Sequence, residues 1–265
     1  MPELRNIEAS DGYRLAYRRW EAGTTPRATF VLLNGIMSNS AWFEPVAPLL
    51  VDAGFTVVGA DRRGSGPNRQ GWGDAPSAGR LVDDVLEIVA HERTPDVPVI
   101  LLGWCWGAAL AINVAPKLDL AGLVLVTPGI HNRPELEQAI VAQRELIASS
   151  AEDAAVIASP VREEWFTDGP QLDAFIRRDE DRVRAMTPRL LDITRRLATA
   201  AAARLRKLDV PLLLVLAEND EATDNEATRA MLPNVETIVL PTRHGVQFDA
   251  PRELAELLTK FAQSP

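Results

Sequence analysis

The chain has 265 residues, of which 46% are hydrophobic and 25% charged, and this composition is typical of a soluble globular protein. Its net charge of −9 excludes a surface that attracts nucleic acid by general electrostatics. One cysteine cannot form an internal disulfide, and with three histidines it is too little for a structural zinc site. We therefore expect no metal and no organic cofactor.

No segment resembles a targeting signal or a membrane span. The first five residues contain no apolar stretch of the kind that a secretory signal needs. Residues 97–116 carry no charge, but they include Pro98, Gly103 and Asn113 and divide into a strand-like half and a helix-like half. The lone cysteine suits a reducing compartment. These features predict a cytoplasmic protein that does not bind membranes.

The N-terminal region predicts a β-hairpin, with one strand around Ile7, the other over residues 13–19, and Asp11-Gly12 in the turn. Short apolar runs then alternate with helical stretches. Runs without polar alternation are typical of strands buried on both faces of a parallel sheet. We expect such strands at residues 30–33, 55–60, 99–102, 123–126, 212–216 and 237–240, and helices at 41–53, 80–92, 108–117, 225–231 and 251–262. This order predicts an α/β fold, with a mostly parallel central sheet and helices on both faces.

Residues 131–207 break the alternation. They contain no strand-like run and are rich in Ala, Arg, Glu and Leu, so we expect an inserted helical lid between two strand–helix units. The core would then comprise residues 1–130 and 208–265. We refer to residues 131–207 as the insertion.

The second half of the insertion is basic. Residues 170–207 hold nine arginines and one lysine against five acids. A solvated helical face is one interpretation. The other is a surface on which an acidic partner docks, such as a carrier protein, and its candidate contacts are Arg177, Arg178, Arg182 and Arg184.

The most informative motif is Gly103-Trp-Cys-Trp-Gly107, in which a predicted strand turns sharply into a predicted helix. Such a turn crowds its neighbours, so residues without a Cβ are needed at Gly103 and Gly107. It also exposes the side chain of Cys105 at a helix N-terminus, where the helix dipole stabilises a thiolate. The pattern is G-x-S-x-G with cysteine in place of serine. A small buried Cys105 without a chemical role is the alternative interpretation.

The motif resembles the nucleophile elbow of the α/β-hydrolase family, and the likeness covers nearly the whole chain. The resemblance implies a triad in the order nucleophile, acid, base: Cys105, Asp220 after the strand at 212–216, and His244 after the strand at 237–240. Three other acids near Asp220 are alternatives, namely Glu218, Glu221 and Asp224. A structural role is the alternative for His244.

The resemblance extends to two further loops. Asn34-Gly35 stands where the family usually has His-Gly, so the backbone N–H of Ile36 would be one oxyanion donor and that of Trp106 the other. Residues 61–66, Asp-Arg-Arg-Gly-Ser-Gly, resemble the family's Asp-x-x-Gly-x-Gly loop. Candidates for lining a substrate pocket, rather than only packing in the core, are Asn34, Trp42, Trp104 and His131.

The expected function is acyl transfer or hydrolysis of an activated ester or thioester through a covalent Cys105 acyl-enzyme. Thioester exchange costs little free energy, so the small-molecule acyl group would come from coenzyme A or a carrier protein. Family members with a cysteine nucleophile include dienelactone hydrolases and some thioesterase domains, and stand-alone thioesterases and acyltransferases of natural-product pathways are similar. One alternative is a hydrolase of small esters or lactones with the same triad. The other is a binding protein that keeps the fold without turnover.

Overall fold

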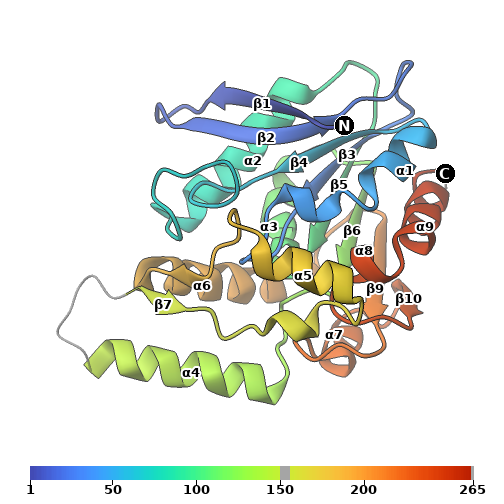
Figure 1. The fold of residues 1–265 in the computed structure, drawn as a ribbon. Coiled ribbons are helices and arrows are strands. Elements are labelled where there is room, and N and C mark those ends of the chain that lie inside the picture. Colours follow the sequence, from blue (N-terminus) through green and yellow to red (C-terminus); the bar gives the residue numbers. More distant parts are fainter. Residues whose placement is uncertain (150–155, 264–265) are drawn as a thin grey trace.

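The computed structural model describes residues 1–149 and 156–263, and its frame is one large sheet (Figure 1). The strands of that sheet are β1 (Glu3–Glu8), β2 (Arg14–Trp20), β3 (Thr29–Leu33), β4 (Thr56–Ala60), β5 (Val99–Trp104), β6 (Gly122–Val126), β9 (Leu212–Ala217) and β10 (Glu236–Leu240). Their order is β1-β2-β4-β3-β5-β6-β9-β10. The hairpin β1–β2 and the pair β2–β4 are antiparallel, and all other neighbours are parallel. The predicted hairpin and mostly parallel sheet are confirmed.

Helices cover both faces of the sheet. They are η1 (Ser40–Phe43), α1 (Ala47–Asp52), α2 (Ala78–Glu92), α3 (Trp106–Val114), η2 (Ala115–Lys117), α4 (Pro134–Ser149), η3 (Glu163–Trp165), α5 (Pro170–Arg178), α6 (Pro188–Leu205), α7 (Asn225–Met231), α8 (Val246–Asp249) and α9 (Pro251–Gln263). Successive side chains of a strand point to opposite faces. In β3, Val31 and Leu33 therefore join the core under α2, α3 and α6, while Phe30 and Leu32 join the core under α1 and α9.

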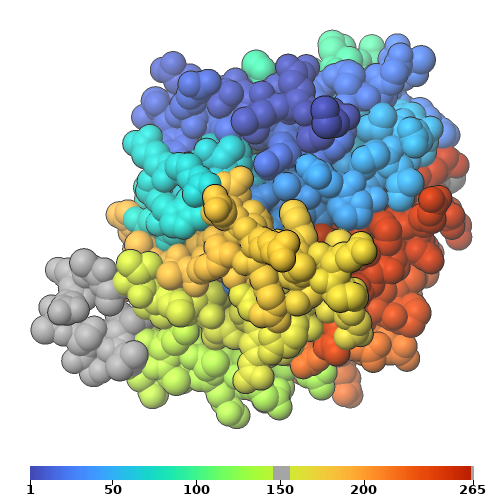
Figure 2. All heavy atoms as spheres, in the orientation of Figure 1, coloured from blue at the N-terminus to red at the C-terminus, as the bar shows by residue number. Residues whose placement is uncertain are grey.

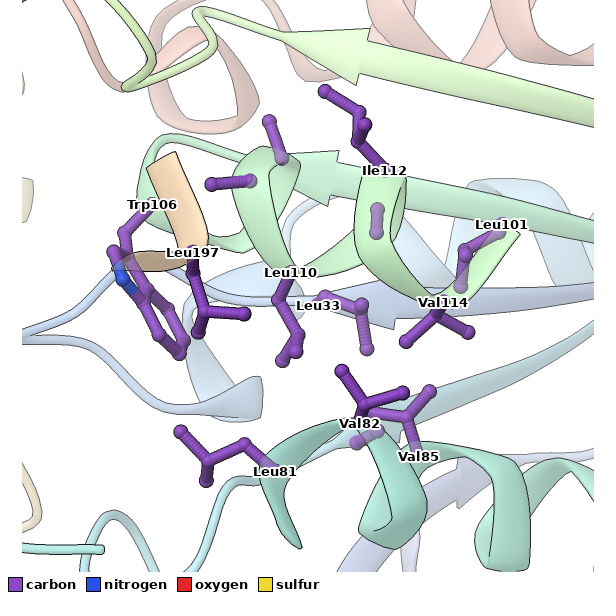
Figure 3. Packing of buried hydrophobic residues seen from close by; sticks show 14 of the residues in the cluster. Leu33, Leu81, Val82, Val85, Leu101, Trp106, Leu110, Ile112, Val114 and Leu197 are labelled. Atoms are coloured by element: carbon purple, nitrogen blue, oxygen red, sulfur yellow. The ribbon is translucent and has the colours of Figure 1, made fainter. Parts of the chain in front are cut away.

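The helix expected at residues 41–53 is in fact two, η1 and α1, separated by a turn that contains Pro45. A proline lacks the N–H that an uninterrupted helix needs at this point. By contrast, α3 is buried at every position, which explains why its sequence is apolar all round. Figure 3 shows its Leu110 and Val114 facing Val82 and Val85 of α2. In the described part of the chain, no helix has both the length and the apolar character to cross a membrane.

The insertion lies between β6 and β9 and forms much of the lower front surface in Figure 2. The expectation that it contains no strand is wrong in one detail. Strands β7 (Ile157–Ala158) and β8 (Ala185–Met186) pair antiparallel. Each is two residues long, which is too short to produce a recognisable alternation of apolar and polar residues.

The last helix of the insertion, α6, packs directly on α3. Leu197 of α6 lies beside Leu110 and Trp106 of α3 (Figure 3), and the Asn113 side chain donates a hydrogen bond of 3.0 Å to the Leu197 carbonyl. Through this contact the insertion is held against the helix that begins directly after Cys105.

Candidate active site

The turn between β5 and α3 holds Cys105 in a backbone conformation that residues other than glycine rarely adopt. Cys105 has φ 56° and ψ −126°. A Cβ at Gly103 would lie 2.4 Å from the Ala108 Cα, and a Cβ at Gly107 would lie 2.2 Å from the Leu33 carbonyl oxygen. Both glycines are therefore needed where the motif has them.

Backbone hydrogen bonds fix this turn to the neighbouring strand and to the loop that follows it. The Cys105 N–H donates to the Val126 carbonyl at 3.0 Å, and the Cys105 carbonyl accepts from the N–H groups of Gly129 at 2.9 Å and Ala108 at 3.1 Å. The Cys105 side chain is partly exposed. A strained backbone that its surroundings hold in place is a common feature of reactive positions.

His244 and Asp220 form a buried pair. The His244 Nδ1 lies 2.9 Å and 3.0 Å from the two carboxylate oxygens of Asp220. Asp220 also accepts hydrogen bonds from the N–H groups of Ala222 and Thr223 and from the Thr223 hydroxyl, at 2.6–2.9 Å. These hydrogen bonds fix the orientation of the Asp220 carboxylate, so that it faces the imidazole.

The three neighbouring acids are placed elsewhere. Glu218 is exposed, Glu221 forms an ion pair with Arg243, and the Asp224 carboxylate caps α7 by accepting from the Ala227 N–H at 2.9 Å. Asp220 is therefore the acid that contacts the histidine.

The charges around His244 favour its protonated form. Burial opposes the charge, but interactions with the Asp220 carboxylate and with Cys105 outweigh it and raise the pKa of His244 to about 10. Burial likewise opposes ionisation of Asp220, yet the imidazolium and the Thr223 hydrogen bonds hold its pKa below the usual range. Asp220 occupies the Nδ1 side of the ring, and Cys105 also interacts with His244, so the remaining Nε2 is available to exchange a proton at Cys105.

Ile36 and Trp106, whose amides are predicted as oxyanion donors, both lie close to Cys105. A Cβ added to Gly35, the residue before Ile36, would lie 3.3 Å from the Cys105 Cβ, and one added to Gly129 would lie 3.1 Å from the Trp106 nitrogen. Among the described residues, neither amide donates a backbone or side-chain hydrogen bond. This geometry leaves both N–H groups free for a developing oxyanion.

A mostly apolar pocket of about 400 Å³ opens on the cysteine. Cys105, Ile36, Trp106, Gly129 and the predicted His131 are among the residues that line it. The rest of its wall comes largely from the insertion, with Leu136, Ile140, Val161, Met186, Leu191, Thr194, Ala198 and Ala202. These residues were missed from the sequence because nothing local to α4 or α6 distinguishes a pocket-facing side chain from a core-facing one.

Three predicted pocket residues do not line this pocket. The Asn34 side chain is buried and donates to the Ser38 carbonyl at 2.6 Å and to the Gly35 carbonyl at 3.0 Å, so it braces the oxyanion loop. Trp42 is fully buried, and its indole N–H donates to Asp179 at 2.7 Å. Trp104 borders only a separate space of about 10 Å³ and donates to the His244 carbonyl at 3.1 Å.

The four arginines predicted to form a docking surface are not all exposed. Arg182 is buried and pairs with Glu163, which also binds the exposed Arg177 at 2.9 Å. Arg184 is exposed and donates to the Arg177 carbonyl at 2.8 Å, and Arg178 is exposed. Arg182 is therefore not exposed to a partner, because its side chain is buried and joins the segment after α5 to η3.

Comparisons with known proteins place the chain in a family. Residues 24–239 match the family described as "Serine aminopeptidase, S33". The chain belongs to this family. Its fold is accordingly the α/β-hydrolase fold that the elbow motif indicated, although Cys105 stands at the nucleophile position of a family named for serine.

Relatives of known sequence include lipases. The chain is 30% identical to human monoglyceride lipase over 137 residues, which are 50% of this chain and 45% of the lipase. The chain thus spans about half the length of the curated lipases that it matches. It is also 26% identical to a putative 2-succinyl-6-hydroxy-2,4-cyclohexadiene-1-carboxylate synthase of Bacillus subtilis, over 98% of both chains.

Two solved structures have the same fold. A soluble variant of monoglyceride lipase from Saccharomyces cerevisiae superposes with a TM-score of 0.85 at 17% identity, over 99% of this chain and 95% of the lipase. The thioesterase domain of the curacin biosynthetic pathway superposes with a TM-score of 0.68 at 18% identity, over 97% and 99%. At these identities the likeness extends to the fold alone.

Proposed function

We propose that this protein hydrolyses esters or thioesters of apolar acyl groups through a covalent Cys105 acyl-enzyme. The observation that carries the proposal is that Cys105, Ile36 and Trp106 line one apolar pocket, while the buried His244–Asp220 pair interacts with Cys105 from outside the pocket wall. The similarity to monoglyceride lipases supports an ester as substrate and water as acceptor.

In acylation, the Cys105 Sγ thiolate attacks the carbonyl carbon, and the π electrons of the C=O bond move to the oxygen. The Ile36 and Trp106 amides donate hydrogen bonds to that oxyanion. As the tetrahedral intermediate collapses, the bond to the alcohol or thiol breaks, and the His244 Nε2 gives its proton to the leaving atom. The products are the free alcohol or thiol and an acyl group in thioester linkage to Cys105.

In deacylation, His244 takes a proton from water, and the hydroxide oxygen attacks the thioester carbon. The oxyanion of this second tetrahedral intermediate accepts hydrogen bonds from the same two amides. Its collapse breaks the C–S bond, releases the carboxylic acid, and restores the thiolate and the imidazolium. Acyl transfer would follow the same path with an amine, alcohol or thiol in place of water.

The proposal is tested by intact-protein mass spectrometry after mixing with a panel of acyl esters and acyl-coenzyme A thioesters. We expect an added acyl mass on the wild type and none on Cys105→Ala, with loss of turnover in the variant and little change in its stability. Cys105→Ser is the matched control, because its adduct is an oxygen ester and resists neutral hydroxylamine, whereas a thioester on Cys105 is cleaved. Wild-type rates in Cys105→Ala would refute the nucleophile assignment.

A further inference from the structure

Arg62 is a buried guanidinium directly behind the oxyanion loop. Its side chain donates to the Ile36 carbonyl at 2.9 Å and to the Arg63 carbonyl at 3.1 Å, while its Nε has no hydrogen-bond partner among the described residues. Only 5% of its surface is exposed. Within the described ranges, no carboxylate forms an ion pair with it, unlike its neighbour Arg63, which pairs with Asp84 and Asp11.

An arginine in this position is costly to the folded state. Burial lowers the pKa of Arg62 to about 10, and the adjacent Asp61 offsets only part of that effect. The Asp61 carboxylate is itself bound by Ser40 and Arg18. Even a buried ion pair can often be replaced by apolar side chains of similar volume without loss of stability, and a buried charge without a paired carboxylate has less to compensate its desolvation. Stability of the fold therefore does not explain why a cation is here.

The contact between Arg62 and Ile36 indicates a role for the buried cation in the reaction. The Ile36 amide is one of the two proposed oxyanion donors, and Arg62 binds the carbonyl of the same residue. Asn34 braces the loop through Gly35 and Ser38, so Arg62 and Asn34 fix it at different points. Arg62 does not line the pocket, so it cannot contact substrate.

We infer that Arg62 is a positioning residue, which fixes Ile36 and places a buried positive charge behind the oxyanion hole. This inference rests on the proposed function. In the ground state the substrate carbonyl is neutral and gains little from the charge. In the tetrahedral intermediate the oxygen is an anion in a poorly solvated site, where a nearby cation has its largest effect.

The test compares three variants of Arg62 on an ester that the wild type turns over. Arg62→Met removes both the charge and the hydrogen bonds, Arg62→Gln keeps one donor without the charge, and Arg62→Lys keeps the charge. We expect Arg62→Met to lower kcat by about tenfold or more with little change in KM, because the lost interaction exists only in the transition state. The kcat of Arg62→Gln should stay as low as that of Arg62→Met, and the kcat of Arg62→Lys should recover part of the loss.

Stability separates this role from a structural one. We expect Arg62→Met to melt at or above the wild-type temperature. Arg63→Met, the matched control, should melt lower because it removes the two Arg63 hydrogen bonds to the buried Asp84 and leaves this carboxylate only its contact with Arg80. An Arg62→Met variant with lowered stability, or with wild-type kcat, would overturn the inference.

A second readout needs no turnover. An alkyl trifluoromethyl ketone adds a thiolate to give a tetrahedral oxyanion, and ¹⁹F NMR measures its binding. Arg62→Met should weaken this adduct by about the factor by which it lowers kcat/KM, and equal adduct affinity in wild type and variant would overturn the inference. Absence of any adduct or turnover in the wild type would instead refute the proposed function.

Discussion

At the scale of single residues, the reactivity of the site depends on two acidic groups that act on one imidazole. Asp220 contacts Nδ1 of His244, and Cys105 interacts with the same ring. Both favour the imidazolium, although burial alone would favour the neutral ring. Because these interactions raise the pKa of His244, we expect the proton that a leaving alcohol needs to be on His244 at neutral pH and to be lost at higher pH.

This arrangement predicts that Cys105→Ala lowers the pKa of His244 below its wild-type value of about 10, because one of the two acidic groups is removed. NMR titration of the ring nitrogens measures it. Cys105→Ser should give a similar decrease, since a serine hydroxyl stays neutral in this range. An unchanged His244 pKa in both variants would show that the thiolate does not act on the ring.

At the scale of elements, the arginines of the insertion serve mainly to hold its helices. Arg182 is buried against Glu163, and on α6 Arg189 pairs with Asp74 of the loop before α2, while Arg195 and Arg196 pair with Asp192. With Arg177, half of the cations that the sequence concentrates in residues 170–207 therefore form ion pairs. The interpretation as a docking surface retains only the exposed positions, among them Arg178.

Charge reversal distinguishes the two kinds of arginine. Arg182→Glu would place a second carboxylate beside Glu163 at a buried site, and we expect it to lower the free energy of unfolding by about 3–5 kcal/mol. Arg178→Glu, on the exposed face of α5, should change it by no more than about 0.5 kcal/mol. Urea unfolding of both variants measures this difference, and equal stabilities would contradict the structural role of Arg182.

At the scale of the whole molecule, the pocket exists only where the core and the insertion meet. The core supplies Cys105, Ile36 and Trp106, and the insertion supplies most of the apolar wall. Thr194, Ala198 and Ala202 are four residues apart on α6, so they lie on one face of that helix, toward the pocket. Their small side chains leave the space that an acyl chain would occupy.

Filling that space should shorten the acyl chain that the enzyme accepts. We expect Ala198→Phe to lower kcat/KM for long-chain esters by about tenfold or more and to leave acetate esters nearly unchanged. Ala203→Phe, at an exposed position of the same helix, controls for a general effect on α6. Assays over a series of chain lengths measure this, and a uniform loss at every length would refute the assignment of the pocket as the acyl site.

The sequence by itself determined the fold class, the parallel strands and the elbow. These depend on patterns local to a few residues, such as an apolar run followed by Gly103 and Gly107 around Cys105. It also indicated Asp220 and His244, because their positions after later strands follow the chain order of a known family. A parallel sheet brings the carboxyl ends of its strands to one edge, so residues at those ends meet without further information.

Only the tertiary structure decided which side chains face the pocket, which are buried and which charges are paired. Trp42 and Arg182 were predicted at functional surfaces and lie in the interior, while the wall formed by α4 and α6 had no local signal. Arg62 and Arg63 are adjacent in the sequence. Only the fold shows that Arg62 binds a backbone carbonyl, whereas Arg63 forms an ion pair with Asp84. Each of these properties depends on a contact between residues far apart in the chain, and local sequence carries no record of such a contact.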